Sequence, residues 1–266
     1  MKLTTHLPNT APQALHTATT HPFLRLAGSG QIPKPLLSQW LSQDRLYAQS
    51  YVRFIGMLLA KIHLPASVGL QSSSESGLKS EGTRAGIEEK VLDILIEAIT
   101  NIRTELKFFE DVAGEYSLDL NVPAGEFSGS GSGSEAKVGG FGSGPITQSY
   151  IDMFMSAGSP GASLLEGLVV LWATEVCYLR AWRYAASFLG EGVGGGRNDA
   201  DGGALRERFI PNWASEEFEG FVERIGVVVD EVAKGEGLGG DGDTLARCER
   251  WWRQVVWLEE RFWPVV

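Results

Sequence analysis

Cysteine is scarce in this sequence, with two residues among 266, Cys177 and Cys248. Both lie inside helical patterns, and they form no spaced framework of the kind that disulfide-rich domains or zinc sites use. Two free thiols in a reducing compartment fit this pattern. The sequence therefore predicts neither a disulfide nor a thiol-based metal site.

Long runs of uncharged apolar residues are also lacking. The most apolar stretch, about residues 164–185, still contains four charged side chains, too many for a segment that must cross about 30 Å of hydrocarbon: Glu166, Glu175, Arg180 and Arg183. The amino-terminal residues show neither an apolar signal core nor an Arg-rich amphipathic pattern. We expect a cytoplasmic protein without a membrane-spanning helix.

Positive charge is sparse and scattered. The formal net charge is -10, and lysine and arginine occur singly rather than in a patch. An acidic surface repels both nucleic acid and anionic membranes. We therefore expect neither of them as a partner.

Period-two alternation of apolar and polar residues, which is typical of half-buried strands, is almost absent. Apolar residues instead recur at helical spacing, and each amphipathic helix must bury its apolar stripe against others. The pattern predicts an all-α, single-domain bundle over residues 1–266, with a loosely organised start and a bend near Pro211. The expected helices cover about residues 33–62, 83–113, 146–157, 162–188, 204–234 and 243–263.

One segment cannot contribute to a core. Between about residues 123 and 145 the sequence consists largely of glycine and serine, which bury too little apolar surface to offset their ordering entropy. We interpret this segment as a mobile insertion within one domain. A linker between two domains is the alternative, but the helices on its two sides lack complementary partners within their own halves.

Three carboxylates lie inside the apolar stripe of an expected helix, where a solvated charge has no place. Asp44 shares a face with aromatic residues, Glu175 interrupts the uncharged run GLVVLWATEVCYL, and Glu259 lies on the apolar face of the last helix. An ionised carboxylate in apolar surroundings is costly unless it is hydrogen-bonded or protonated. Three such groups predict a shared polar pocket.

Structural explanations remain open for each of these residues. A lone carboxylate on an apolar face is commonly satisfied by a tyrosine hydroxyl, a tryptophan N–H or an arginine, and Asp44 could pair with Arg45 or Arg53 at the surface. Aromatic stripes at helical spacing usually belong to a core. The three carboxylates indicate a functional site only if they converge on one cavity.

Four motifs follow one another along the chain: HPFLRLAGSGQIPKPLLSQWLSQDRLYAQSYVRF, PITQSYIDMF, NWASEEFEGFV and WLEERFW. Their content and order resemble the TenA (thiaminase II) family, which has an all-helical, haem-oxygenase-like fold. The resemblance covers nearly the whole chain apart from the Gly/Ser-rich insertion. It implies that this chain has the same fold.

The sequence departs from the family at one functional position. Common members carry a nucleophilic cysteine on the helix that here reads LWATEVCYL, and alignment on Tyr178 puts Thr174 at that place. Glu175 follows at once, which resembles the glutamate-type subgroup of the family. Cys177, three residues beyond Thr174, points away from Glu175 in a helix, so we do not expect it to act as the nucleophile.

The resemblance implies hydrolysis of a thiamin-derived pyrimidine in thiamin salvage, without a cofactor. The substrate would be 4-amino-5-aminomethyl-2-methylpyrimidine, its N-formyl derivative or thiamin itself, and the sequence does not choose between them. By the same resemblance, Asp44 would pair with a ring nitrogen and the exocyclic amine. Four aromatic side chains would line or stack on the ring: Tyr47, Tyr150, Tyr178 and Trp213.

Charge placement alone suggests a compatible mechanism. Removing an amine or a formyl group with water requires a base for the water and an acid for the departing nitrogen. Glu175 and Glu259 are the candidates. Our hypothesis is that Glu259 passes the proton to the leaving nitrogen while Glu175 activates or positions the water, although the roles could be reversed.

Two other classes of protein fit parts of the pattern. One is a non-catalytic pyrimidine-binding or regulatory protein that kept the pocket without the cysteine. The other is a helical oxygenase, but the helices lack the paired Glu and Glu-x-x-His ligands of a di-iron site, and His21 is expected to cap a turn rather than bind haem.

Oligomeric state is suggested by the resemblance alone. Family members usually form dimers or tetramers, which implies a homodimer or a homotetramer. Trp251 and Trp252, read as exposed aromatics, would suit the interface.

Overall fold

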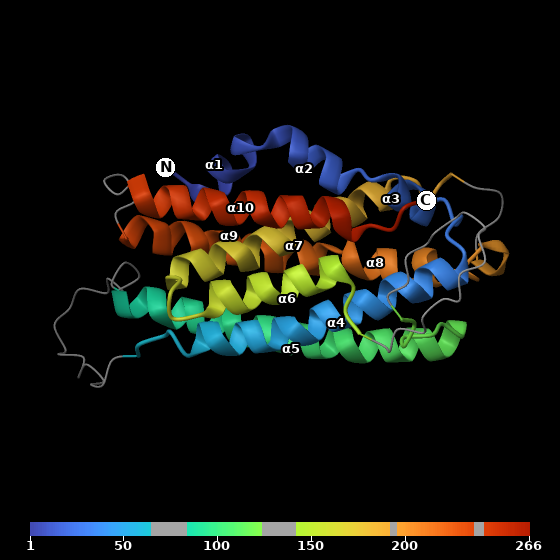
Figure 1. Cartoon of the computed structure of the whole chain (residues 1–266), viewed down its shortest axis with the longest axis horizontal. Helices are drawn as coiled ribbons and strands as arrows, with labels where there is room; N and C mark the ends of the chain where they lie inside the picture. Colours follow the sequence, from blue (N-terminus) through green and yellow to red (C-terminus); the bar gives the residue numbers. More distant parts are fainter. Residues whose placement is uncertain (65–83, 124–141, 192–195, 237–241) are drawn as a thin grey trace, which may run out of the picture.

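The computed structural model describes residues 1–64, 84–123, 142–191, 196–236 and 242–266. Regular structure in these ranges is entirely helical, which confirms the all-α fold class (Figure 1). The Gly/Ser-rich insertion expected at about residues 123–145 lies largely outside the described residues. The helices are α1 Leu3–Thr10, α2 Pro12–Thr19, α3 Pro22–Gly28, α4 Lys34–Leu59, α5 Arg84–Tyr116, α6 Pro145–Gly158, α7 Leu164–Ala186, η1 Gly196–Asn198, η2 Leu205–Phe209, α8 Ile210–Trp213, α9 Glu216–Gly235 and α10 Gly242–Phe262.

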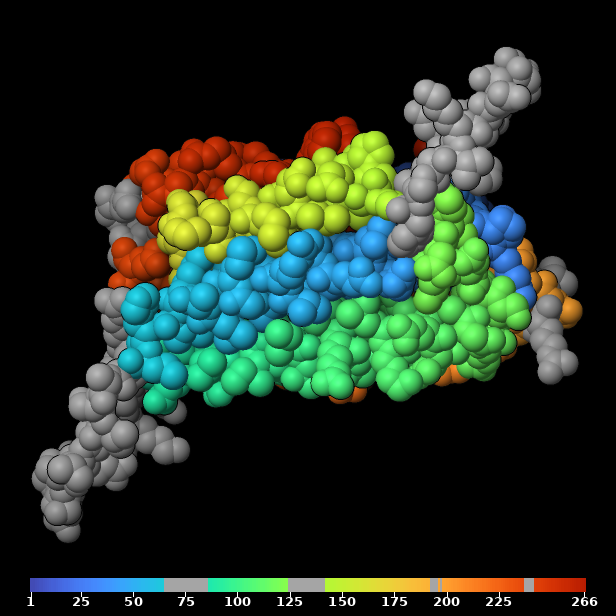
Figure 2. All heavy atoms as spheres, turned by 60° about the horizontal axis from the view of Figure 1, so that its bottom comes forward, coloured from blue at the N-terminus to red at the C-terminus, as the bar shows by residue number. Residues whose placement is uncertain are grey.

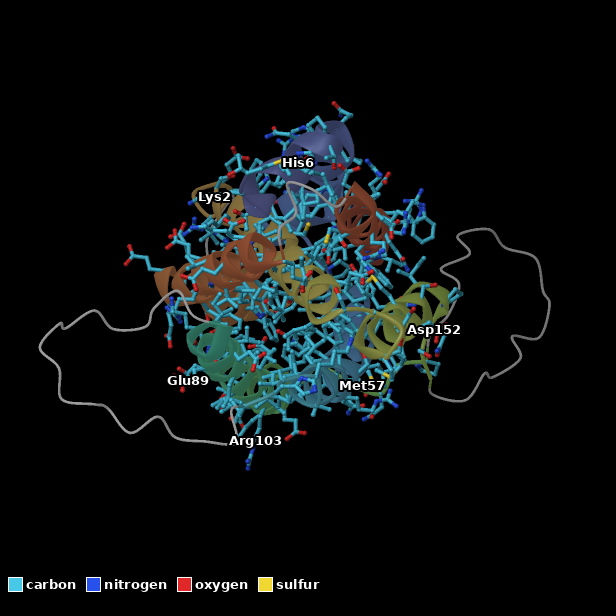
Figure 3. The ribbon with its side chains drawn as sticks, turned by 90° about the vertical axis from the view of Figure 1, so that its left-hand side faces the viewer. Lys2, His6, Met57, Glu89, Arg103 and Asp152 are labelled. Atoms are coloured by element: carbon cyan, nitrogen blue, oxygen red, sulfur yellow. The ribbon has the colours of Figure 1, made fainter. Side chains whose placement is uncertain are left out.

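The long helices run side by side along the molecule, with α7 at the centre. On one face α6, α4 and α5 lie next to one another (Figure 2). The view along the bundle shows the helices around a common interior, with Met57 of α4, Glu89 of α5 and Asp152 of α6 marking three of them (Figure 3). None of the described helices is both long and apolar enough to cross a membrane.

Helix α7 is buried along most of its length because apolar residues cover most of its circumference and other helices pack around it. Its start is fixed by a capping box: the Glu166 backbone N–H donates to the Ser163 hydroxyl at 3.1 Å, and the Ser163 N–H donates to the Glu166 carboxylate at 2.8 Å. Arg180 and Arg183 near the end of α7 are exposed, but since α7 contacts α4, α6, α9 and α10, its other polar side chains point into the protein interior. Glu175 is one of them.

The core consists of two apolar clusters placed one after the other along the bundle. On α4 the first cluster takes residues 51–58 and the second takes residues 36–41, with Asp44 between them. On α5 the clusters take residues 91–98 and 109–113, with Glu105 between them. Asp44 and Glu105 therefore both lie at the seam between the two clusters.

The expected single helix over residues 204–234 is wrong, because the chain breaks after Trp213. A π-helical turn, α8 and α9 take its place, and the Ser215 hydroxyl caps α9 by accepting from the Phe218 N–H at 3.1 Å. Pro211 lies at the start of α8, where a missing N–H costs no helical hydrogen bond. The cap at Ser215, rather than the proline, redirects the chain.

The expected loose start is also wrong, because three short helices cover residues 3–28. Leu3 and Leu7 are fully buried. The Thr4 hydroxyl donates to Asp230 of α9 at 2.7 Å, which ties α1 to the bundle. His21 caps α3 as expected, accepting from the Phe23 N–H at 3.2 Å.

Trp251 and Trp252 do not form an exposed aromatic patch, so that expectation is wrong. Trp252 is fully buried and stacks on Trp172 with ring centroids 5.6 Å apart. Trp251 is half-buried and donates its N–H to Glu166 at 3.1 Å. The reason is that α10 packs against α7 along the face that carries them.

Candidate active site

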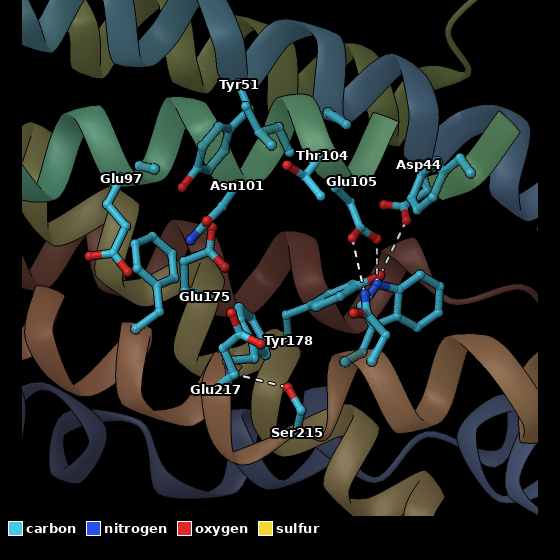
Figure 4. Close-up of a pocket in the computed structure, with 18 of the residues that line it drawn as sticks. Asp44, Tyr51, Glu97, Asn101, Thr104, Glu105, Glu175, Tyr178, Ser215 and Glu217 are labelled. Atoms are coloured by element: carbon cyan, nitrogen blue, oxygen red, sulfur yellow. Dashed lines mark hydrogen bonds between the residues drawn. The ribbon is translucent and has the colours of Figure 1, made fainter. Parts of the chain in front are cut away.

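A cavity of about 290 Å³ lies at the seam, enclosed by α4, α5, α7 and the α8–α9 segment (Figure 4). Its buried lining residues come from α4, α5, α8 and α9, and α7 adds the half-buried Glu175 and Tyr178. Its exposed lining residues lie on α5 and on the α8–α9 segment, so the cavity opens to solvent between these elements: Asn101, Thr104, Asn212, Glu217 and Arg224.

Five of the seven predicted site residues line this cavity: Asp44, Tyr47, Glu175, Tyr178 and Trp213. They come from three elements distant in sequence, α4, α7 and α8. The convergence expected for the acidic residues therefore occurs for Asp44 and Glu175.

Tyr150 and Glu259 are not among the lining residues. Both are buried, and the Tyr150 hydroxyl donates to Glu259 Oε1 at 2.6 Å. The Tyr150 ring meets the Tyr47 ring edge-on with centroids 5.1 Å apart. Because Tyr47 lines the cavity, this pair lies one layer behind the wall.

Asp44 does not form the surface ion pair that the sequence left open. It is 3% exposed and accepts a hydrogen bond from the Tyr178 hydroxyl at 3.2 Å. Arg45 instead donates to the Leu120 carbonyl at 3.3 Å, and Arg53 is exposed. Burial raises the pKa of Asp44 well above its ordinary value, and the charges of neighbouring carboxylates raise it further.

The two candidate acid–base groups have unequal pKa values. Burial raises the pKa of Glu175 to about 7, against the opposing effect of a hydrogen bond from Tyr51. Burial raises the pKa of Glu259 to about 8, opposed by the hydrogen bond from Tyr150 and reinforced by the charge of Glu175. Carboxyls with separated pKa values near neutrality are suited to acid–base chemistry.

No cysteine thiol contributes to the cavity wall within the described residues. Thr174 is buried, and its hydroxyl donates to the carbonyls of Val170 at 3.2 Å and Leu171 at 2.9 Å. Cys177 is fully buried, and burial raises the pKa of its thiol well above the ordinary value. A neutral thiol outside the cavity is a poor nucleophile.

Glu105, which also lines the cavity, was not among the residues predicted from the sequence. Its carboxylate accepts from the Trp213 indole N–H at 2.5 Å and from the Asn212 amide at 3.1 Å. Burial raises the pKa of Glu105 to about 7, against the effect of these two donors. A signal was present, because Glu97, Asn101 and Glu105 recur every four residues and share one helix face.

An ion pair crosses the opening. Arg224 of α9 donates from Nε to Glu97 of α5 at 3.2 Å, and its guanidinium makes a second, shorter contact with the same carboxylate. The pair links the two elements that border the entrance. The charge of Arg224 is therefore neutralised by Glu97, and we do not expect Arg224 to bind a ligand.

Among the described residues the lining is acidic, with Arg224 as the one Lys or Arg side chain against five carboxyls: Asp44, Glu97, Glu105, Glu175 and Glu217. Such a wall favours ligands that donate hydrogen bonds or carry positive charge, and it disfavours phosphorylated ones. In the part of the chain that the structure describes, no group of three or more His, Cys, Asp or Glu is arranged to hold a metal ion.

Solved structures with this architecture span nearly the whole chain. A TenA homologue from Pyrococcus furiosus has a TM-score of 0.69 at 23% identity, over 98% of this chain and 97% of that one. The chain has the TenA fold. A TenA family transcription regulator from Silicibacter sp. TM1040 matches with a TM-score of 0.69 at 13% identity, over 98% and 95% of the two chains. A putative TenA-like thiaminase from Sulfolobus solfataricus P2 matches with a TM-score of 0.64 at 15% identity, over 99% and 94%.

At the level of the fold, these matches confirm the TenA resemblance seen in the four motifs. No family model matches the sequence. A curated protein of Fusarium pseudograminearum (strain CS3096), described as a probable transcription factor, is 33% identical over 289 residues. The match covers 98% of this chain and 51% of the relative, so the chain spans about half the length of that protein.

Proposed function

We propose that this chain is a cofactor-free hydrolase of the glutamate-type TenA subgroup, which cleaves a C–N bond of a thiamin-derived aminopyrimidine in thiamin salvage. The observation that carries the proposal is the meeting of Asp44, Glu175, Tyr178 and Trp213 in one cavity of a TenA fold. Carboxyl and aromatic groups are what a small, hydrogen-bonding ring requires.

The cavity supports a single ring as ligand. Its volume of about 290 Å³ is at the lower end of small-molecule sites and suits one heteroaromatic ring with short substituents. Asp44 lies at the inner part of the cavity beside the Tyr178 hydroxyl, where it can meet a ring nitrogen and an exocyclic amine. The rings of Tyr178 and Trp213, with centroids 5.4 Å apart, supply apolar walls.

Glu175 is the group we propose to meet the reacting water. It lines the cavity, and a pKa of about 7 lets it accept a proton near neutrality. The water oxygen forms a bond to the carbon under attack, its proton passes to Glu175, and the C–N bond breaks. The nitrogen leaves after it takes up a proton, as ammonia or as the free amine of a deformylated pyrimidine.

Glu259 is proposed as the source of that second proton. Its pKa of about 8 keeps it protonated at neutral pH. Because it lies behind Tyr47, its proton leaves through its hydrogen-bond partner, the Tyr150 hydroxyl, with the direction of that hydrogen bond reversed, rather than by direct contact with the ligand. The reverse assignment would require Glu259 to meet the water, and its place behind the wall argues against this.

Product release tests the proposal. Purified protein is incubated with 4-amino-5-aminomethyl-2-methylpyrimidine and, separately, with its N-formyl derivative, while ammonia and formate are measured. We expect release of either ammonia from the first substrate or formate from the second. We expect Glu175→Gln to lower the rate of that release at least 100-fold. Near-normal turnover in both Glu175→Gln and Glu259→Gln would contradict the proposed roles of these two residues.

A non-catalytic pyrimidine-binding or regulatory protein is the second candidate. The description of the Fusarium relative as a probable transcription factor, together with threonine where common TenA members have the nucleophilic cysteine, favours it. Tight binding of the pyrimidine without any product would select this candidate. Visible absorbance of the purified protein would instead indicate a haem or iron oxygenase.

Two further proposals rest on the TenA resemblance alone. We propose a homodimer or homotetramer, with an interface that does not use the buried Trp252, and sedimentation of the purified protein measures its mass. We also propose a cytoplasmic location, which imaging of a tagged chain would test.

A further inference from the structure

Asp44 and Glu105 approach the same part of the cavity from α4 and α5 (Figure 4). They are surrounded differently. Each oxygen of Glu105 accepts one N–H, from Trp213 at 2.5 Å and from Asn212 at 3.1 Å. Asp44 accepts the Tyr178 hydroxyl at 3.2 Å on one oxygen.

Donors on both oxygens favour the ionised form of a carboxyl, and two buried carboxyls close together do not readily ionise at once. Glu105 has the better-satisfied oxygens, so the negative charge belongs to Glu105 and the proton to Asp44. The other titratable groups that act on Asp44 are Tyr178 and Glu175 of α7 and Glu259 of α10. Burial is the main cause of the raised pKa of Asp44, and the charges of Glu105, Glu259 and Glu175 raise it further, with Glu105 the strongest of the three.

We propose that Glu105 is a specificity-determining residue: by holding the negative charge, it leaves Asp44 as a neutral acid that offers the ligand one O–H donor and one acceptor. This inference rests on the proposed function, because it takes the ligand to be an aminopyrimidine.

The protonation state of Asp44 decides which form of the pyrimidine ring it can bind. A neutral aminopyrimidine presents a ring nitrogen that accepts and an exocyclic amine that donates. A neutral carboxylic acid matches this pair with two hydrogen bonds. An ionised carboxylate has two acceptors and no donor, and it would pair only with a ring that has taken up a proton. Glu105 therefore selects the neutral form of the ring, so that binding needs no proton uptake at pH 7 to 8.

The first test replaces Asp44 by its neutral isostere. Asparagine offers one N–H donor and one acceptor, as a protonated Asp44 does, whereas alanine offers neither. Binding of the unreactive probe 4-amino-2,5-dimethylpyrimidine is measured by calorimetry at pH 7.5. We expect Asp44→Asn to bind within about tenfold of wild type and Asp44→Ala to bind at least 100-fold more weakly, a loss of about 2.7 kcal/mol.

The outcomes separate this inference from the proposed function. If the wild-type protein binds the probe but Asp44→Asn is as weak as Asp44→Ala, the inference is overturned and the proposed function stands. If the wild-type protein does not bind the probe at millimolar concentration, both are overturned. Thermal melts of each variant exclude loss of the fold as the cause.

The second test removes the charge of Glu105. Without it, Asp44 ionises at lower pH, so binding must take up a proton and the affinity falls with rising pH, by up to tenfold per pH unit. The matched control is Glu97→Gln, which removes a lining carboxylate from the same helix at the cavity opening. We expect the decline in affinity to begin at lower pH in Glu105→Gln than in wild type and Glu97→Gln. Coincident profiles for all three proteins would overturn the inference, and a purely structural role of Glu105 would not shift the profile.

Discussion

The Tyr150 hydroxyl donates to Glu259 at 2.6 Å in the interior of the bundle, joining residues 109 positions apart in the sequence. This hydrogen bond lowers the pKa of Glu259, but burial outweighs it and the pKa stands at about 8. Glu175, also surrounded by protein, has a pKa of about 7. The folded protein therefore holds protons on these carboxyls that the unfolded chain releases near pH 4.5.

Stability should decrease as the pH rises. Between pH 4.5 and 8 the folded state binds more protons than the unfolded state, so the free energy of unfolding has a negative slope against pH. The stabilisation that comes from the proton on Glu259 is fully present below pH 4.5 and is lost as the pH rises through about 8. Its size is about 1.4 kcal/mol of unfolding free energy for each unit by which folding raises the pKa. Calorimetric melting of wild type and Glu259→Gln from pH 5 to 9 measures it. We expect a shallower decline in the variant, and equal slopes would contradict the buried, protonated Glu259.

Activity should follow a bell-shaped dependence on pH. Turnover rises as Glu175 ionises near pH 7 and falls as Glu259 loses its proton near pH 8, which places the optimum between these values. The rate constant kcat is measured from pH 5.5 to 9.5. Glu259→Gln should lose the alkaline limb and retain the acidic one. Loss of the acidic limb instead would mean that the two roles are reversed.

Cys177 should be dispensable for catalysis. Its thiol is buried outside the cavity, and its raised pKa keeps it neutral. We expect Cys177→Ala to keep kcat within about twofold of wild type and expect thiol-alkylating reagents to leave the native enzyme active. A loss of 100-fold or more in a folded Cys177→Ala protein would mean that the thiol reaches the substrate.

Trp252 should contribute to the stability of each subunit rather than to its assembly. Because it is fully buried against Trp172, Trp252→Ala should destabilise the fold by about 3–5 kcal/mol. Trp257 on the same helix is 47% exposed, and Trp257→Ala is the matched control, expected within about 0.5 kcal/mol. Chemical denaturation measures both. A Trp252→Ala protein of normal stability but reduced mass would contradict the assignment.

Helical periodicity predicted the long helices well, because each carries an apolar stripe that the bundle buries. The expected 146–157 and 243–263 correspond to 145–158 and 242–262. The three short helices at the start were missed because each is too short for a clear apolar period. They depend on packing against the long helices: α1 on α9 and α10, α2 on α7 and α10, and α3 on α7. The break at Ser215 was missed although serine followed by glutamates is a helix-start signal.

The site was predicted in part for a similar reason. A carboxylate on an apolar face is visible in the sequence, which is how Asp44 and Glu175 were found. Glu105 lies on the polar face of α5, which would face solvent unless another element covered it, and the α8–α9 segment does so only in the folded protein. Glu259 was correctly expected to be buried, but periodicity does not tell which of several neighbouring helices a buried side chain meets.

A crystal structure with 4-amino-5-hydroxymethyl-2-methylpyrimidine bound tests the central claim most directly. We predict that the ring packs against the wall formed by Tyr178 and Trp213, with its ring nitrogen and exocyclic amine against Asp44 and its hydroxymethyl group toward Glu175. A ligand elsewhere, or a cavity without ligand in crystals grown at saturating concentration, would contradict the account.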